Sequence, residues 1–131
     1  MKWLSFYCRG LASHDKKLAL KRLIASKKLD VIFLQETLGH SEKIVSILNV
    51  MNREWIFDSL NVKGCLGGMT LGINGRIMKF LNIWGREGVL VAYVSSEEIG
   101  MEFHLINIYG PCHNRATFSE DLMSETFMQQ E

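Results

Sequence analysis

The stretch that decides the fold runs from Leu29 to Thr37 and reads LDVIFLQET. A run this short, apolar and rich in β-branched residues is typical of a buried strand. Side chains alternate along a strand, so Ile32, Leu34 and Glu36 share one face. Reactive groups in α/β proteins collect where parallel strands end. The sequence therefore predicts that Glu36 lies at such an exit.

Two interpretations of Glu36 stay open. A buried carboxylate is costly unless a cation or hydrogen-bond donors meet it, so this residue is a candidate metal ligand. Alternatively, Glu36 caps the segment that follows or pairs with a basic side chain nearby. Position alone favours the second, structural interpretation.

Composition indicates one folded domain. The chain has 131 residues, a net charge of +1 and 47% hydrophobic residues, which predicts a single domain over residues 1–131 and argues against disorder. No stretch is long enough for a membrane-spanning helix, so no membrane partner is expected. The apolar run from Trp3 to Cys8 is too short for a secretory signal, and an intracellular location is expected. Cys8, Cys65 and Cys112 are odd in number and widely spaced, which favours free thiols.

Charge is distributed unevenly along the chain. Residues 1–30 contain eight Lys or Arg and two acids, whereas residues 97–131 contain seven acids and one Arg. A basic segment can face phosphate backbones. Most of these basic residues fall on one predicted helix, however, whose solvent side would be charged in any case. The pattern therefore favours a solvated helix face.

The residues before the central strand predict a βαβ unit. Lys2–Tyr7 alternates as a strand, and Ser13 is a suitable cap for the helix that follows. The apolar stripe of this helix is Leu20, Leu23 and Ile24, expected opposite Lys17, Lys21 and Lys28. A βαβ crossover makes its two strands parallel, so Tyr7 should approach Glu36.

The rest of the chain predicts a second helix from Ser41, further strands and a helix from Asn114. The strands are expected at Glu54–Leu60, Gly68–Ile73, Ile77–Trp84, Val89–Val94 and Met101–Tyr109. Glycines between the middle three, including the Asn74-Gly75 pair, favour hairpins. Gly64, Gly67 and Gly68 favour a turn over a phosphate-binding loop, because Met69–Ile73 continues as a strand and not as a helix. The predicted architecture is a layered α/β domain with a mixed sheet.

Four motifs follow one another in a specific order. They are Met1–Leu11 (MKWLSFYCRGL), Asp30–Thr37 (DVIFLQET), Gly67–Met69 (GGM) and Asn107–Pro111 (NIYGP). In order and spacing they resemble the endonuclease/exonuclease/phosphatase superfamily of DNase I-like proteins. The chain is most similar to the endonuclease domain of plant LINE-type non-LTR retrotransposon polyproteins. The likeness covers the whole chain but only the first half of that domain.

This resemblance implies the amino-terminal half of a four-layer α/β sandwich with flanking helices. It implies a Mg²⁺-dependent (or Mn²⁺-dependent) endonuclease that hydrolyses phosphodiester bonds in DNA. By the resemblance, Glu36 matches a metal ligand and Tyr109 matches a tyrosine that helps hold the substrate phosphate. The match is chemically sensible, because Mg²⁺ prefers oxygen ligands and needs only one or two carboxylates beside substrate phosphate and water.

Two departures from the family pattern matter. Where the first strand of the family ends in Trp-Asn, this chain has Phe6 and Tyr7, and a phenol cannot replace the paired donor and acceptor of an amide. The Asp-x-Asn, Asn-Asp and Ser-Asp-His motifs of the family would lie beyond Glu131, and neither His104 nor His113 stands in a family catalytic position. The domain is therefore expected to be truncated and inactive as an isolated chain.

Two further expectations follow. The alternative to a nuclease is a non-catalytic remnant that acts as a nucleic-acid or protein binding module. Half of a sandwich also leaves an apolar sheet face uncovered, so association with a second copy or a complementary half is expected.

Overall fold

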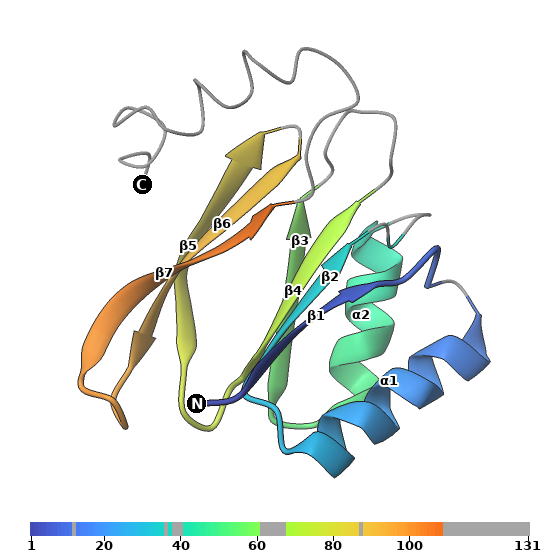
Figure 1. Ribbon diagram of the computed structural model, residues 1–131, viewed down its shortest axis with the longest axis horizontal. Helices are drawn as coiled ribbons and strands as arrows, with labels where there is room; N and C mark the ends of the chain where they lie inside the picture. The colour runs from blue at the N-terminus through green and yellow to red at the C-terminus, as the bar shows by residue number, and fades with distance from the viewer. Residues whose placement is uncertain (12, 36, 38–40, 61–67, 87, 109–131) are drawn as a thin grey trace.

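The computed structural model describes every residue except 12, 36, 38–40, 61–67, 87 and 109–131. The described elements occur in the order β1 (Trp3–Tyr7), α1 (His14–Lys27), β2 (Val31–Gln35), α2 (Ser41–Met51), β3 (Trp55–Leu60), β4 (Met69–Asn74), β5 (Lys79–Arg86), β6 (Val89–Ser96) and β7 (Met101–Ile108). They form three layers, in which the helices cover one sheet and the second sheet covers its other face (Figure 1). Neither α1 nor α2 is long and apolar enough to cross a membrane.

The strands divide into two sheets. Sheet A has the order β1-β2-β4-β3, with β1 parallel to β2 and the other neighbours antiparallel. Sheet B has the order β5-β6-β7 and is entirely antiparallel. The predicted mixed sheet is therefore confirmed, and its parallel pair comes from the predicted βαβ unit.

Local signals explain where α1 begins and ends. The Ser13 hydroxyl accepts a hydrogen bond from the Lys16 backbone N–H at 3.2 Å, which satisfies one of the donors that a helix start leaves unpaired. At the other end Lys28 adopts a left-handed conformation with φ of 51° and closes the helix. The prediction that Lys17 faces solvent is wrong, because this residue is buried. It lies three residues before Leu20, which is the spacing of one helix face.

Strand β2 contributes to two cores. Its Ile32 and Leu34 pack with the helices on one side of sheet A, whereas Val31 and Phe33 pack against sheet B on the other side. All four side chains are buried. The stretch that begins at Leu29 is thus the centre of the fold, as the sequence predicts.

The predicted hairpin at Asn74-Gly75 is wrong. Strand β4 lies between β2 and β3 in sheet A, and β5 begins sheet B, so this turn carries the chain from one sheet to the other. The hairpin between β5 and β6 is confirmed. The helix predicted from Asn114 and the turn predicted around Gly64 and Gly67 lie outside the described residues.

Candidate functional site

Three strands end together at one side of the sandwich. In the parallel register of β1 and β2, Tyr7 is opposite Gln35, so the last residues of these strands are neighbours. The end of β7 joins them from sheet B, because the Gln35 side-chain amide donates to Asn107 Oδ1 at 3.0 Å and to the Ile108 carbonyl at 3.1 Å. We call Tyr7, Gln35, Asn107 and Ile108 the strand-exit rim.

The buried Asn107 side chain connects the residues of this rim through hydrogen bonds. Its side chain is 2% exposed, and its amide nitrogen donates to the Leu34 carbonyl at 3.4 Å while its oxygen accepts from Gln35. Buried amides need such partners, because an unpaired one would lose the hydrogen bonds that water provides. The two sheets are therefore joined at the rim by polar contacts rather than by apolar packing alone.

The two principal candidate residues lie outside the described part of the chain. Glu36 directly follows Gln35, and Tyr109 directly follows Ile108. The residues that precede them, Gln35 and Ile108, form the 3.1 Å hydrogen bond across the rim. The roles of Glu36 and Tyr109 as metal ligand and phosphate contact therefore stay predictions.

The backbone on both sides of position 36 is anchored. The Gln35 carbonyl accepts from the Cys8 N–H at 2.9 Å, and the Thr37 carbonyl accepts from the Leu11 N–H at 2.8 Å. The Thr37 N–H donates to the Gly68 carbonyl at 3.2 Å, next to the start of β4. The residues after β1 and before β4 thus hold the chain where the candidate ligand is carried.

Tyr7, the position at which the sequence departs from the family pattern, is the last residue of β1. Its ring is partly exposed, and the Arg9 guanidinium carbon lies 5.7 Å from the ring centre, a cation–π distance. The contact places one positive charge beside the rim. Whether Tyr7 acts in a site stays a prediction.

A lysine shapes the turn after β1, and sequence reasoning missed it. The Lys16 ammonium donates to the carbonyls of Cys8, Arg9 and Gly10 at 3.3, 3.1 and 3.1 Å. An ammonium has three hydrogens, so these contacts match its donor capacity. The turn contains a left-handed residue, Arg9, with φ of 50°, followed by Gly10 with φ of 93°. The Arg9-Gly10 pair, one residue beyond the end of β1, was the available signal.

The other expected residues have plain structural roles. Asn107 is a hydrogen-bonding residue near the end of β7, and the sequence did not indicate its partner Gln35. His104 stacks on Tyr93 with 4.8 Å between ring centres and meets Trp84 edge-on at 5.7 Å, within sheet B. His113 lies outside the described residues.

The described residues do not by themselves make a magnesium site. Among them, no three His, Cys, Asp or Glu side chains lie close enough to hold a metal ion. The rim provides amide groups that already bond to each other, and Mg²⁺ is ordinarily held by carboxylates, phosphate and water.

Two stacked sheets with helices on the outer face of one of them match the DNase I-like α/β fold over about half of its length. Comparison with solved structures agrees: the neighbours found are endonuclease/exonuclease/phosphatase superfamily proteins. No protein-family model matches the sequence, and no curated protein does. The identities to the solved structures are low, so the likeness is one of fold.

Three of these structures show the range of the superfamily. TDP2 from D. rerio, complexed with a single-strand DNA product, has a TM-score of 0.64 and 17% identity, over 96% of this chain and 52% of that chain. A mannosyl-6-phosphatase from Bacteroides thetaiotaomicron has a TM-score of 0.68 and 8% identity, over 98% and 61%. An AP endonuclease from Leishmania major has a TM-score of 0.59 and 17% identity, over 95% and 44%. This chain therefore spans about half the length of the structures it matches.

Proposed function

We propose that the chain carries the amino-terminal part of a metal-dependent DNA endonuclease site of retrotransposon origin, acting inside the cell. Glu36 would be the ligand that this part of the chain supplies to Mg²⁺ or Mn²⁺, and Tyr109 would contact the substrate phosphate. Tyr7 would be a degenerate position of the same site. The four sequence motifs motivate the retrotransposon origin, and a neighbour bound to DNA motivates the substrate.

One observation carries this proposal. Gln35 donates to the Ile108 carbonyl at 3.1 Å, so the residues that directly precede Glu36 and Tyr109 are in contact although they are far apart in sequence. Active sites need groups from several strand ends held in fixed relative positions. A buried amide network provides such support because it specifies one arrangement of the two sheets.

We further propose that these 131 residues alone do not turn over substrate. The sequence contains no Asp-x-Asn, Asn-Asp or Ser-Asp-His run, the motifs that would complete the site by resemblance. Groups in an active site act as a unit, and loss of part of the unit lowers the rate by several powers of ten. Binding is therefore the sharper readout of the site.

The test is Mn²⁺-dependent binding of a fluorescently labelled DNA duplex, measured by anisotropy. We expect Mn²⁺ to strengthen binding by the wild-type chain and Glu36→Gln to remove this gain, because the amide keeps the shape of the side chain but not its charge. Glu42→Gln is the matched control, since Glu42 is an exposed acid in the first turn of α2. Equal binding with and without Mn²⁺ in the wild type would contradict the proposed site.

Plasmid nicking tests the absence of turnover separately. We expect no Mg²⁺-dependent or Mn²⁺-dependent nicking by the wild-type chain. Nicking that disappears in Glu36→Gln would show that the isolated chain is active, and would at the same time support the nuclease assignment.

A non-catalytic nucleic-acid binding module is the second candidate, favoured by the charge of α1. This helix carries five Lys or Arg and one Asp over His14–Lys27. Binding to phosphates through such a helix releases counterions and falls steeply with salt. Under this alternative, DNA binding would not depend on Mn²⁺ and would weaken when the exposed residues Lys21 and Arg22 are changed to Gln.

A further inference from the structure

The first strand has an open edge. Of the strands that the structure describes, only β2 pairs with β1, and β1 lies at the same side of the sandwich as the outer edge of β7 (Figure 1). Trp3 is 63% exposed and Phe6 is 44% exposed, so this edge presents large apolar side chains to solvent. Both faces of sheet A are covered by the two cores, so the apolar surface that this sheet leaves open lies at its edge.

Strand β1 is the only one of the four described edge strands without a protective feature. Edge strands usually carry a charge, a proline or a bulge that prevents pairing with another chain. The edge strand β3 contains Asp58, β5 has a bulge between Phe80 and Asn82, and β7 contains Glu102. The sequence of β1, Trp-Leu-Ser-Phe-Tyr, has none of these features.

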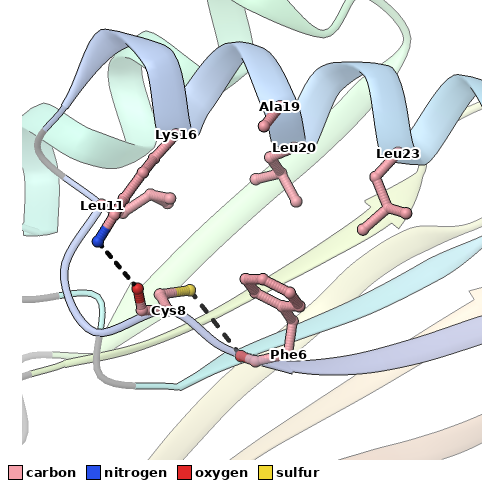
Figure 2. Close-up of a pocket in the computed structure, with 7 residues that line it drawn as sticks. All are labelled: Phe6, Cys8, Leu11, Lys16, Ala19, Leu20 and Leu23. Atoms are coloured by element: carbon pink, nitrogen blue, oxygen red, sulfur yellow. Dashed lines mark hydrogen bonds between the residues drawn. The ribbon is translucent and has the colours of Figure 1, made fainter.

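Hollows lie on both sides of this edge. A helix-side pocket of about 340 Å³ lies between β1 and α1, lined by Phe6 from the strand and by Ala19, Leu20 and Leu23 from the helix (Figure 2). An inter-sheet groove of about 440 Å³ lies between β1 and β7, lined by apolar side chains that include Trp3 and by polar ones that include Gln35 and Asn107 of the strand-exit rim. Successive side chains of one more strand beside β1 would point alternately into these two hollows.

The chemistry of the helix-side pocket favours an apolar occupant. Its one charged lining group, Lys16, donates to three backbone carbonyls, including that of Cys8 (Figure 2). The other lining side chains are apolar or, in Cys8, a buried thiol. Aliphatic or aromatic side chains therefore match the pocket better than an anion does.

We propose that the occupant is a second copy of this chain, whose β1 pairs antiparallel with β1 about a two-fold axis at Ser5. The sequence of β1 is nearly symmetric in chemical character about Ser5, with Leu4 and Phe6 on either side and aromatic residues beyond them. A two-fold interface requires this self-complementarity, since each patch meets its own copy.

The backbone of β1 is oriented for this pairing. Just before β1, the Lys2 carbonyl accepts from the Val31 N–H at 3.2 Å, and just after it the Cys8 N–H donates to the Gln35 carbonyl. Even-numbered residues therefore direct their backbone N–H and carbonyl groups to β2. Backbone groups alternate along a strand, so those of Trp3 and Ser5 point to the open side. Ser5 and Ser5 of the partner subunit can then exchange two hydrogen bonds with their Cα atoms about 5.5 Å apart.

With this two-fold axis, side chains of the partner subunit lie toward both hollows. Leu4 of the partner subunit lies opposite Phe6, on the side of the helix-side pocket, and Tyr7 of the partner subunit lies opposite Trp3, on the side of the inter-sheet groove. The dimer would close an edge that is open in the single chain.

Sedimentation velocity over a micromolar concentration series tests this proposal. We expect the wild-type chain to approach twice its mass of 15.0 kDa as the concentration rises. Ser5→Lys and Ser5→Glu each place two like charges across the axis, and each should raise the dissociation constant of the dimer by about tenfold or more. An equimolar mixture of the two variants should dimerise again, because Lys then faces Glu. Leu81→Lys, on the exposed part of edge strand β5, is the matched control and should leave the dimer unchanged.

Each other result overturns the proposal. A wild-type chain that is monomeric at every concentration has no such interface. A dimer that Ser5→Lys does not weaken uses another surface. If Ser5→Lys and Ser5→Glu both lose the dimer and their mixture does not regain it, the loss does not come from like charges that face each other across an axis at Ser5. None of these measurements involves metal or DNA, so the outcome is independent of the proposed function.

Discussion

Strands β1 and β2 are parallel neighbours of five residues each, and both are mainly apolar and aromatic. Four of the five residues of β2 are buried, whereas four of the five residues of β1 are exposed. The difference comes from position: β2 has a strand on each side and a core on each face, whereas β1 lies at the edge and pairs with β2 alone among the described strands. Local sequence therefore indicates that a segment is a strand, and tertiary structure decides what that strand does.

The comparison separates two kinds of effect. Substitutions in β2 should lower the free energy of unfolding, because they remove contacts from the two cores. Substitutions on the open edge of β1 should change association more than they change unfolding. Four predictions test this separation, and they are ordered by expected size.

The largest effect is expected for Leu34→Ala in β2. Leu34 is completely buried, and a buried Leu→Ala change typically costs about 2–5 kcal/mol of unfolding free energy. Urea unfolding followed by circular dichroism measures it. The matched variant in β1 is Phe6→Ala, which should cost less although it removes more atoms, since Phe6 is already partly exposed. Equal losses in the two variants would remove the distinction between the strands.

The second prediction concerns how closely a neighbouring strand packs on β2. Gly72 in β4 is opposite Ile32 in register, and a Cβ added at Gly72 would lie 2.7 Å from Cδ1 of Phe57, nearer than side-chain carbons approach. Gly72→Ala should therefore cost about 1–3 kcal/mol of unfolding free energy through overpacking. Urea unfolding of Gly72→Ala, Phe57→Leu and the double variant measures their coupling. We expect the double variant to lose less unfolding free energy than the sum of the two single losses. Additive losses would mean that the Phe57 side chain does not cause the overpacking.

The third prediction concerns the polar contact at the end of β2. Asn107→Ala removes the acceptor of the Gln35 amide and the donor to the Leu34 carbonyl, and should cost about 1–2 kcal/mol. Gln35→Ala should cost less when Asn107 is already Ala, since the two side chains form one network. A double-mutant cycle by urea unfolding measures this coupling. A coupling near zero would mean that the strand-exit rim is not held by these amides.

Much of the fold could be predicted because its signals are local. Ser13 marks a helix start, the spacing of Leu20 and Ile24 marks a buried face, and a helix between two strands implies a parallel pair. The position of Lys17 could also have been predicted, since its spacing from Leu20 places the two on one face. A long aliphatic stem allows a lysine to be buried there while its ammonium reaches a polar group.

The division into two sheets could not be predicted from the turn alone. Asn74-Gly75 suits a hairpin, and it equally suits a chain that leaves one sheet and enters another. Gly75 is needed in either case, because a Cβ there would lie 2.5 Å from the Glu54 carbonyl oxygen. The better signal was the mainly apolar run Met69–Ile73, whose residues are all buried, as expected for an interior strand with cores on both faces.

The candidate site was predictable only in part. The sequence indicated that β1 and β2 end side by side, which is confirmed by the register of Tyr7 and Gln35. It gave no sign that Gln35 would reach Asn107, because a contact between sheets depends on how the sheets stack. Such contacts join residues 72 positions apart, beyond the reach of any local pattern.

The smallest effect is expected at the helix that joins β1 to β2. Ser13→Ala removes the oxygen that accepts from the Lys16 N–H and should cost about 1 kcal/mol of unfolding free energy. Ser26→Ala is the matched control, because the Ser26 hydroxyl donates to the Leu23 carbonyl in the last turn of the same helix and alanine has the better helix propensity. Urea unfolding should therefore show a loss for Ser13→Ala and none for Ser26→Ala. Ser13→Asp should retain most of the stability, since a carboxylate also caps a helix and interacts favourably with the positive end of the helix dipole.

The Ser13 cap lies at the start of the link from β1 to β2, so the loss for Ser13→Ala should be the same whether or not the chain is dimeric. A loss that changed with protein concentration would instead mean that the Ser13 end of α1 takes part in the contact between copies, and the effects assigned to β1 and β2 would no longer be separate.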